Sequence, residues 1–139
     1  MLVLHQRIGE WLGVRAPNTD QQMLELVERQ IPTSSINRLL ALGLTRTEID
    51  SLVIPLRTLQ RRRERREKLT VEESDRVMRL LRLFSHAESV YGSQERALGW
   101  LRHPRTRFGK RTALSLLKTD VGSRIVEEML VQIDHGMFV

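Results

Sequence analysis

The sequence predicts an all-α fold built from two small helical domains. Apolar residues recur every three or four positions along most of the 139 residues, and a residue that caps helices precedes nearly every such stretch. No segment alternates between apolar and polar residues for long enough to predict a strand, and residues 1–8 are the only weak candidate. The composition, 40% hydrophobic and 29% charged, is that of a folded globular chain.

Start and stop signals mark each predicted helix in the first half. They are, in order, a cap within residues 18–20 with a stop at Pro32, a cap within residues 33–35 with a stop at Gly43, a capping box of Thr45 and Glu48, and Pro55 at a first helical position. A capping box is a strong local signal, because its two side chains satisfy backbone N–H groups that a helix start leaves unpaired.

The second half carries the same kinds of signal. They are, in order, a capping box of Thr70 and Glu73 with a stop at Gly92, a cap at Ser93 with a stop at Pro104, a cap at Thr112, and a cap at Thr119 or Asp120 with a stop at Gly136. The helix over residues 71–91 is the longest, and we expect its apolar stripe to form a homodimer interface or the junction between the two halves. The stripe consists of Val77, Leu80, Leu81, Phe84 and Tyr91.

Positive charge is concentrated near the middle of the chain. Residues 1–68 hold 12 basic and 8 acidic side chains, a net +4, and residues 69–139 hold 11 and 9, a net +2. Residues 57–68 alone hold seven basic and two acidic side chains, a net +5. We expect two domains, residues 1–68 and residues 69–139. The overall charge of +6 favours an anionic partner, although a GC-rich genome also explains why Arg outnumbers Lys.

The residue content excludes several classes of protein. The absence of Cys rules out a disulfide scaffold, a thiol nucleophile and a thiolate metal site. The 4 His residues have no metal-ligand spacing, and no phosphate-binding or nucleophile motif is present, so we expect no enzyme, no metal and no cofactor. No apolar run reaches the roughly 20 residues that cross a bilayer, and the N-terminal apolar burst is too short for a signal peptide. We expect a cytoplasmic protein with no membrane partner.

Residues 33–66 have the layout of a helix-turn-helix unit. On a helical wheel, Leu56 and Leu59 mark the buried face of its last, basic helix, and Val53 and Ile54 occupy the turn where Gly is usual. A DNA recognition helix needs a polar opposite face, whereas a merely solvated face is the alternative. That face and its flanks consist of Arg57, Thr58, Gln60, Arg61, Arg62 and Arg65.

Two kinds of contact with operator DNA are expected from this face. Arg57 and Arg61 lie one helical turn apart and are expected to reach base edges in the major groove. Arg62 and Arg65 are expected to reach phosphates, which position the helix without reading sequence.

The second half resembles a known family of toxin-binding domains. The residues that carry the resemblance are Ala97, Leu98, Trp100, Leu101, Pro104, Phe108, Gly109, Leu114, Leu116, Leu117, Thr119, Gly122, Val126, Leu130, Ile133 and Gly136. They resemble the pattern of the Xre/MbcA/ParS antitoxins, which belong to type II RES–Xre toxin–antitoxin pairs, over roughly residues 70–139. Residues 52–76 resemble the Xre-type DNA-binding half of that family. Two positions depart from the pattern, because Ala113 replaces a Pro and Lys110 replaces a second Gly.

The resemblance implies an Xre-like helix-turn-helix domain joined through a long helix to a small helical toxin-binding domain. The implied partner is a RES-domain toxin, an NAD-degrading enzyme whose active site the antitoxin covers. The first domain is implied to bind the promoter of its own operon as a repressor. The loop and tail residues that we expect at the toxin pocket are Arg105, Arg107, Gly109, Lys110, Arg111, Met137, Phe138 and Val139.

The last predicted helix offers a further surface for the toxin. Its apolar residues cover an arc of about 180°, which is wider than one packing partner usually requires. The alternative function is a stand-alone Xre-type transcriptional repressor whose second half only dimerises. An adjacent reading frame that encodes a RES protein would favour the antitoxin over this repressor.

Overall fold

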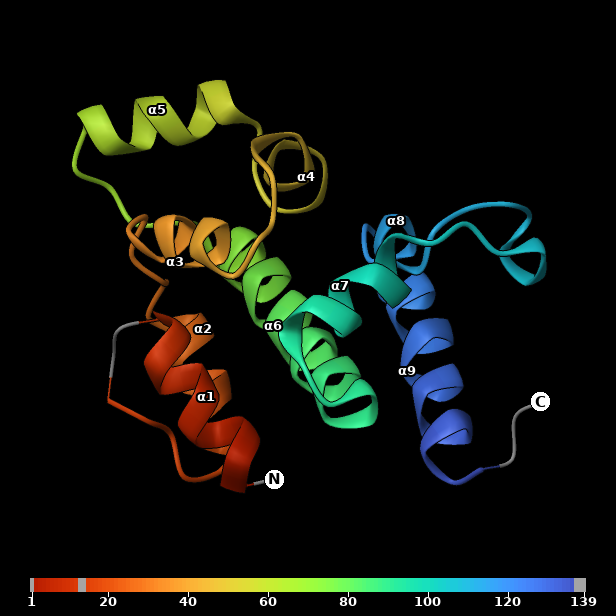
Figure 1. The fold of residues 1–139 in the computed structure, drawn as a ribbon. Coiled ribbons are helices and arrows are strands. Elements are labelled where there is room, and N and C mark those ends of the chain that lie inside the picture. Colours follow the sequence, from red (N-terminus) through yellow and green to blue (C-terminus); the bar gives the residue numbers. More distant parts are fainter. Residues whose placement is uncertain (1, 13–14, 137–139) are drawn as a thin grey trace. The chain divides into compact units, whose positions relative to one another are not determined.

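A computed structural model describes residues 2–12 and 15–136 of the chain (Figure 1). These residues form nine α-helices and one 3-10 helix, and their only β pairing is an isolated antiparallel bridge between Arg105 and Arg111. The all-α fold predicted from the sequence is confirmed. No helix within the described ranges is long and apolar enough to cross a membrane.

The chain forms two compact units that divide between Met78 and Arg79. The division falls inside the long helix α6 (Val71–Tyr91), whereas the expected boundary between residues 68 and 69 lies just before that helix. The first two turns of α6 therefore belong to the first unit, where they pack and hydrogen-bond with the helix-turn-helix segment.

Five helices precede α6 in the first unit. They are α1 (Leu2–Leu12), α2 (Asp20–Glu28), α3 (Ser35–Ala41), α4 (Arg46–Leu52) and α5 (Leu56–Glu64). Two of the starts use a predicted side-chain cap: Thr19 accepts the N–H of Gln22 before α2, and the Thr45–Glu48 capping box before α4 is formed in both directions. Ser34 precedes α3 without a side-chain capping bond, and Pro55, predicted as the first residue of α5, is its N-cap instead. The core is aliphatic, and its fully buried side chains include Ile36, Leu39, Ile49, Ile54, Leu69 and Val77.

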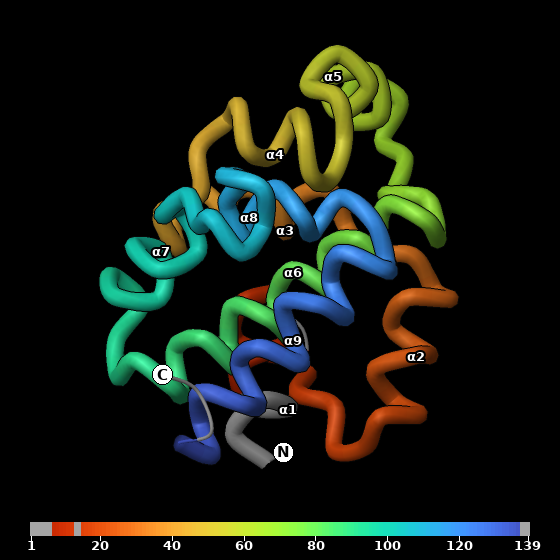
Figure 2. Tube along the Cα trace, turned by 90° about the vertical axis from the view of Figure 1, so that its right-hand side faces the viewer, coloured from red at the N-terminus to blue at the C-terminus, as the bar shows by residue number. Residues whose placement is uncertain are grey.

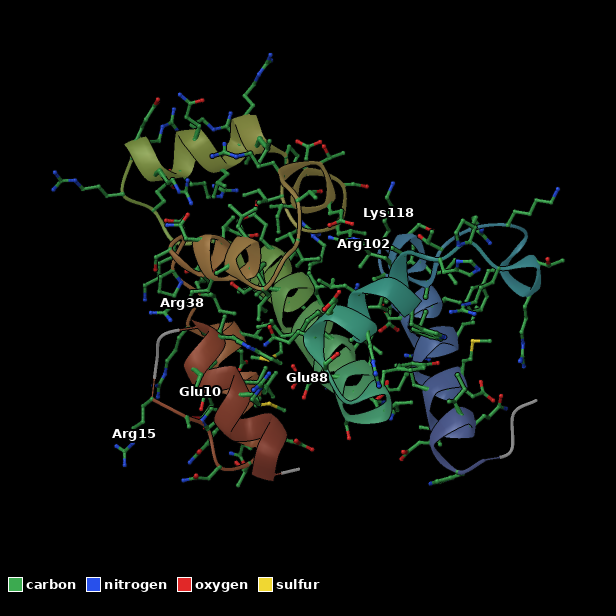
Figure 3. The ribbon with its side chains drawn as sticks, viewed as in Figure 1. Glu10, Arg15, Arg38, Glu88, Arg102 and Lys118 are labelled. Carbon is green, nitrogen blue, oxygen red and sulfur yellow. The ribbon has the colours of Figure 1, made fainter. Side chains whose placement is uncertain are left out.

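Residues 1–8, the weak strand candidate, lie largely in α1, so that prediction is wrong. The physical reason is tertiary packing: Ile8, Trp11 and Leu12 stand at helical spacing and are buried, and α1 contacts α3. Arg38 of α3 donates a 3.0 Å hydrogen bond to the backbone carbonyl of Glu10 (Figure 3). An apolar stretch this short has no periodicity that separates a strand from a helix before its packing partner is known.

The second unit begins within α6 and continues through three helices and a 3-10 turn. They are α7 (Gln94–Arg102), η1 (Thr106–Phe108), α8 (Ala113–Leu116) and α9 (Asp120–Asp134), and Figure 2 traces them as a tube. The predicted caps Ser93, Thr112 and Thr119 each accept a backbone N–H group. At Gly122 a Cβ would collide with the backbone carbonyl of Leu116, so only glycine lets α9 start this close to α8.

Candidate functional sites

The turn between α4 and α5 is held by burial rather than by a glycine. Val53 and Ile54 are 2% and 0% exposed, and the carbonyl of Ile49 accepts both of their N–H groups. Asp50 caps α5, because its Oδ1 accepts the N–H of Leu56 at 2.8 Å. This role of Asp50 was not predicted from the sequence. The signal was available, since an acidic residue stands six positions before the first residue of a helix that has no capping side chain at Pro55.

The outward face of α5 has the composition expected for a recognition helix. Arg57, Gln60, Arg61 and Arg65 are exposed and Thr58 is half-buried, while Leu59 on the opposite side is 4% exposed. The side chains of Arg57, Arg61 and Arg65 take part in no ion pair within the described residues. These guanidinium groups are therefore available to an anionic partner. In Figures 1 and 2, α5 follows α4 after a short connection, as in a helix-turn-helix unit.

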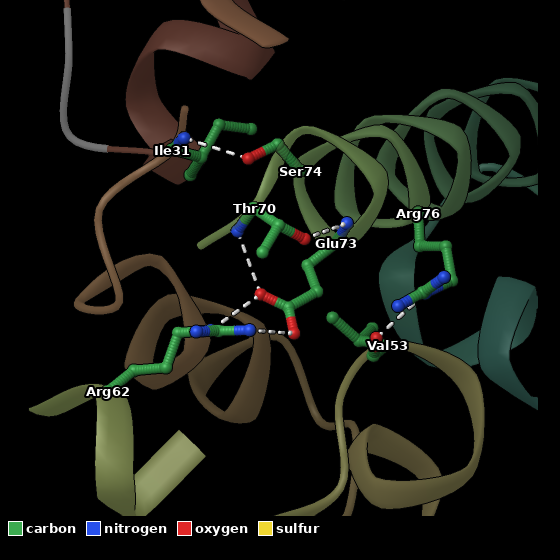
Figure 4. Close-up of polar contacts among 7 residues, drawn as sticks. All are labelled: Ile31, Val53, Arg62, Thr70, Glu73, Ser74 and Arg76. Carbon is green, nitrogen blue, oxygen red and sulfur yellow. Dashed lines mark hydrogen bonds and ion pairs between the residues drawn. The ribbon is translucent and has the colours of Figure 1, made fainter. Parts of the chain in front are cut away.

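Arg62 differs from the other arginines of this set, because it is bound inside the unit. Its Nε and Nη2 atoms donate to Oε1 and Oε2 of Glu73 at 2.9 and 3.2 Å (Figure 4). The two side chains are only 18% and 7% exposed. The predicted phosphate contact of Arg62 would therefore have to compete with this ion pair.

Glu73 joins two elements through one carboxylate. Its Oε1 also accepts the N–H of Thr70 at 2.8 Å, and its own N–H donates to Thr70 Oγ1, so the predicted capping box of α6 is formed. Burial acts to raise the pKa of Glu73, but the hydrogen bonds from Arg62 and Thr70 outweigh burial and hold this pKa below its usual value. The hydrogen bond to Glu73 likewise raises the pKa of Arg62. The pair therefore stays charged at neutral pH.

Other residues in the first two turns of α6 also hold distant segments. Arg76 Nε donates to the carbonyl of Val53 at 2.8 Å, and the buried Ser74 Oγ accepts the N–H of Ile31 at 2.9 Å (Figure 4). No local pattern revealed these contacts, because their partners lie many residues away. The start of α6 thus fixes both the turn before α5 and the last turn of α5.

The basic loop of the second unit is closed on itself. The N–H of Arg105 donates to the carbonyl of Arg111 at 3.1 Å, and the N–H of Lys110 donates back to the carbonyl of Arg105 at 2.8 Å. Gly109 and Lys110 both have left-handed backbones, with φ of 65° and 66°. Glycine adopts this conformation without a Cβ clash, whereas lysine does so at a cost. Lys110 is where the resembled pattern has its second Gly, and the backbone supplies the reason for that Gly.

Arg105 is half-buried and packs within its own unit. Its guanidinium lies 4.9 Å from the centroid of the Trp100 ring, and its Nη2 donates to the carbonyl of Trp100 at 3.3 Å. The Trp100 ring in turn stacks on Tyr91, with centroids 5.7 Å apart. Burial raises the pKa of Tyr91 above its usual value. The structure therefore gives Arg105 a role in holding the loop against α7.

Of the remaining predicted toxin contacts, four are exposed in the structure and three lie outside the residues that it describes. Arg107, Gly109, Lys110 and Arg111 are exposed, although Arg111 Nε also donates to the carbonyl of Phe108 at 3.2 Å. Met137, Phe138 and Val139 lie outside the described residues.

The apolar arc of α9 is only partly buried. Val126, Met129 and Leu130 are at most 5% exposed, whereas Val121 and Ile125, one turn apart, are 67% and 45% exposed. Part of the arc is thus open, as the sequence predicted. Within the described residues, no group of three or more acidic, His or Cys side chains is placed to hold a metal ion.

Comparison with known proteins assigns both units to one family. Residues 22–82 match the antitoxin Xre-like helix-turn-helix domain, and residues 86–136 match the antitoxin Xre/MbcA/ParS C-terminal toxin-binding domain. Among curated relatives, an antitoxin Xre of Pseudomonas putida is 46% identical over 93 residues, which cover 67% of this chain and 58% of the relative.

Two further relatives carry antitoxin names. An antitoxin Xre of Yersinia enterocolitica is 35% identical over 86 residues, 61% of this chain and 58% of the relative. A Prs ADP-ribosylating antitoxin of a Sphingobium species is 28% identical over 98 residues, 64% of this chain and 62% of the relative. The chain therefore spans less than two thirds of each relative. The two matched domains, in the same order as the two units, show that the chain belongs to the Xre/MbcA/ParS family of antitoxins.

Proposed function

We propose that this protein is the antitoxin of a toxin–antitoxin pair, which neutralises its toxin through the second unit and binds operator DNA through α5. The observation that carries the proposal is the succession of a helix-turn-helix match and a toxin-binding match along the chain. The exposed arginines of α5 fall within the first match, and the basic loop and the open face of α9 fall within the second.

We propose further that the toxin is a RES-domain enzyme that degrades NAD and that the antitoxin covers its active site. The name of the Sphingobium relative supports this, because ADP-ribosylation draws its ADP-ribose from NAD. An NAD site accommodates a pyrophosphate, and the exposed Lys110 and Arg111 carry the charge to occupy such a site. No enzymatic activity is proposed for this chain.

A rescue assay tests the toxin-binding part. Cells that express the cognate toxin receive the wild-type chain, the Arg111→Glu variant, or a chain without residues 136–139, and growth and NAD content are measured. We expect both changes to weaken rescue. Lys118→Glu is the matched control, because Lys118 is an exposed cation of the same unit outside the loop. Undiminished rescue by both test variants would remove the loop and the tail from the mechanism.

A promoter titration tests the DNA-binding part. The wild-type chain is expected to bind a fragment of its own operon's promoter more tightly than an unrelated fragment, with an affinity that falls steeply as salt rises. A stand-alone repressor would pass this test and fail the rescue assay, so the two assays together separate it from the antitoxin.

We propose that the protein binds DNA as a homodimer, because helix-turn-helix dimers place two recognition helices one DNA turn apart. The stripe expected at a dimer interface is already covered within one chain, since Val77, Leu81 and Phe84 are at most 1% exposed. The dimer must therefore use another surface. Sedimentation at micromolar concentration tests the proposal, and a 16.2 kDa monomer would contradict it.

A further inference from the structure

The geometry points to a positioning role for the ion pair between Arg62 and Glu73. We propose that this pair fixes the rotation of α5, so that Arg57 and Arg61 face the DNA, and that Arg62 itself does not bind phosphate. The functional part of this inference rests on the proposed DNA binding. Its structural part, that the pair holds α5 in place, is measured on the protein without DNA.

Arg62 has few exposed N–H donors that could contact DNA. Both Nε and Nη2 are directed at the Glu73 carboxylate, at 2.9 and 3.2 Å, in the bidentate geometry that suits a guanidinium. The Arg62 side chain is 18% exposed, whereas Arg61 and Arg65 are exposed residues. A phosphate that took over the Nε and Nη2 donors would break the pair and leave Glu73, 7% exposed, without its counter-charge.

Glu73 is itself fixed, so it is a firm anchor for α5. Its carboxylate accepts the N–H of Thr70 and its N–H donates to Thr70 Oγ1, which ties the side chain to the first turn of α6. Arg76 on the next turn holds the carbonyl of Val53, in the turn that leads into α5. The recognition helix is thus attached to α6 at its entry and in its last turn (Figure 4), and two points of attachment restrict both its tilt and its rotation.

Four single variants separate positioning from direct contact. Glu73→Gln removes the charge but retains an oxygen that caps the Thr70 N–H, because glutamine also serves in capping boxes. Its matched control is Glu72→Gln, which removes the same charge from an exposed neighbour in the same turn. Arg62→Gln removes the proposed partner, and its matched control is Arg65→Gln, at an exposed arginine of the same segment.

Promoter affinity is titrated at several salt concentrations for each variant. A change that only removes a negative charge strengthens binding to DNA, so Glu72→Gln should bind as tightly as wild type or more tightly. Glu73→Gln should instead weaken binding about tenfold, which corresponds to about 1.4 kcal/mol. Arg62→Gln should weaken binding by a similar factor without changing the salt slope. Arg65→Gln should lower the slope by about one unit, as expected for a lost phosphate contact.

The double variant tests whether the two residues act as one unit. Arg62→Gln combined with Glu73→Gln should weaken binding no more than either single change, because each single change already breaks the pair. Arg62→Lys provides a second check. Lysine retains the charge but loses the bidentate fork, so Arg62→Lys should bind promoter DNA nearly as weakly as Arg62→Gln. An affinity close to wild type would mean that only the charge matters.

Two results of the DNA titrations would overturn the inference. One is a salt slope lowered by about one unit in Arg62→Gln, together with tighter binding by Glu73→Gln, which would identify Arg62 as a phosphate ligand. The other is additive losses in the double variant.

Hydrogen exchange of the free protein tests the positioning role without relying on DNA binding. The amides of α5 should exchange faster in Glu73→Gln than in Glu72→Gln. Unchanged exchange would contradict the positioning role whatever the DNA result. If wild-type protein binds no promoter DNA, the proposed function fails, and the exchange data still decide whether the pair holds α5.

Discussion

Helix α5 and the basic loop between α7 and α8 are two arginine-rich segments that use their charges in parallel ways. Each presents exposed cations, and each also contains an arginine whose guanidinium packs inside its own unit. In α5 this arginine is Arg62, which pairs with Glu73 on another helix, and in the loop it is Arg105, which lies over Trp100. The partners differ because α5 packs against a charged helix start, whereas the loop packs against an aromatic side chain. A basic cluster thus contains both contact residues and residues that hold the cluster in place.

The largest expected effect comes from the exposed arginines of α5. Arg57→Ala combined with Arg61→Ala should lower the affinity for operator DNA by about 10²-fold or more, since each bidentate base contact is worth about 1–3 kcal/mol. Both residues are exposed, so stability should change little. Promoter titration beside the toxin rescue assay checks this. Wild-type affinity would mean that α5 is not the recognition helix, and lost rescue would mean that the two functions are not separable.

The Arg62–Glu73 pair should dominate the pH dependence of the first unit. Glu73→Gln should lower the free energy of unfolding by about 1–2 kcal/mol at pH 7. Because the pKa of Glu73 is lowered in the folded state, this contribution is complete above the usual glutamate pKa and is lost as pH falls through the folded-state pKa. The difference between wild type and variant in urea unfolding should therefore shrink below about pH 4. A difference that does not vary with pH would contradict this.

The equivalent change in the loop should have a smaller effect. Arg105→Ala removes a cation–π contact and a hydrogen bond to the Trp100 carbonyl, and should lower the free energy of unfolding by about 1 kcal/mol. Because an arginine remains charged across this range, the effect should be the same at pH 3 and pH 7, unlike that of Glu73→Gln. Lys118→Ala, at an exposed cation, is the control and should change stability little. If Arg105→Ala and Lys118→Ala lowered the free energy of unfolding equally, Arg105 would have no special role in holding the loop.

The smallest expected effect is a stabilisation. Lys110 has a φ of 66°, so Lys110→Gly should raise the free energy of unfolding by about 0.5 kcal/mol, the relief of the left-handed strain less the added freedom of the unfolded chain. Thermal unfolding measures this change. If the Lys110 charge contacts the toxin, the same variant should rescue cells less well although it is more stable. A destabilised variant would show that other contacts of Lys110 outweigh the strain.

The sequence by itself determined the helices that carry local start signals. The capping boxes Thr45–Glu48 and Thr70–Glu73 form as predicted, because each joins groups only three residues apart and needs no other part of the fold. The exposed face of α5 followed from helical periodicity, since the spacing of Leu56 and Leu59 predicts which side is buried; Leu59 is buried and Leu56 half-buried.

Only the tertiary structure decided the elements and roles that depend on distant partners. The N-terminal segment became α1 because α3 covers its apolar face, and Arg62 and Arg105 turned inward because Glu73 and the Trp100 ring lie within their reach. Residues 62 and 73 lie in different helices, so neither periodicity nor capping patterns connect them. The physical reason is that local sequence sets backbone conformation and charge, whereas the partner of a long, flexible arginine side chain is set by which elements pack beside it.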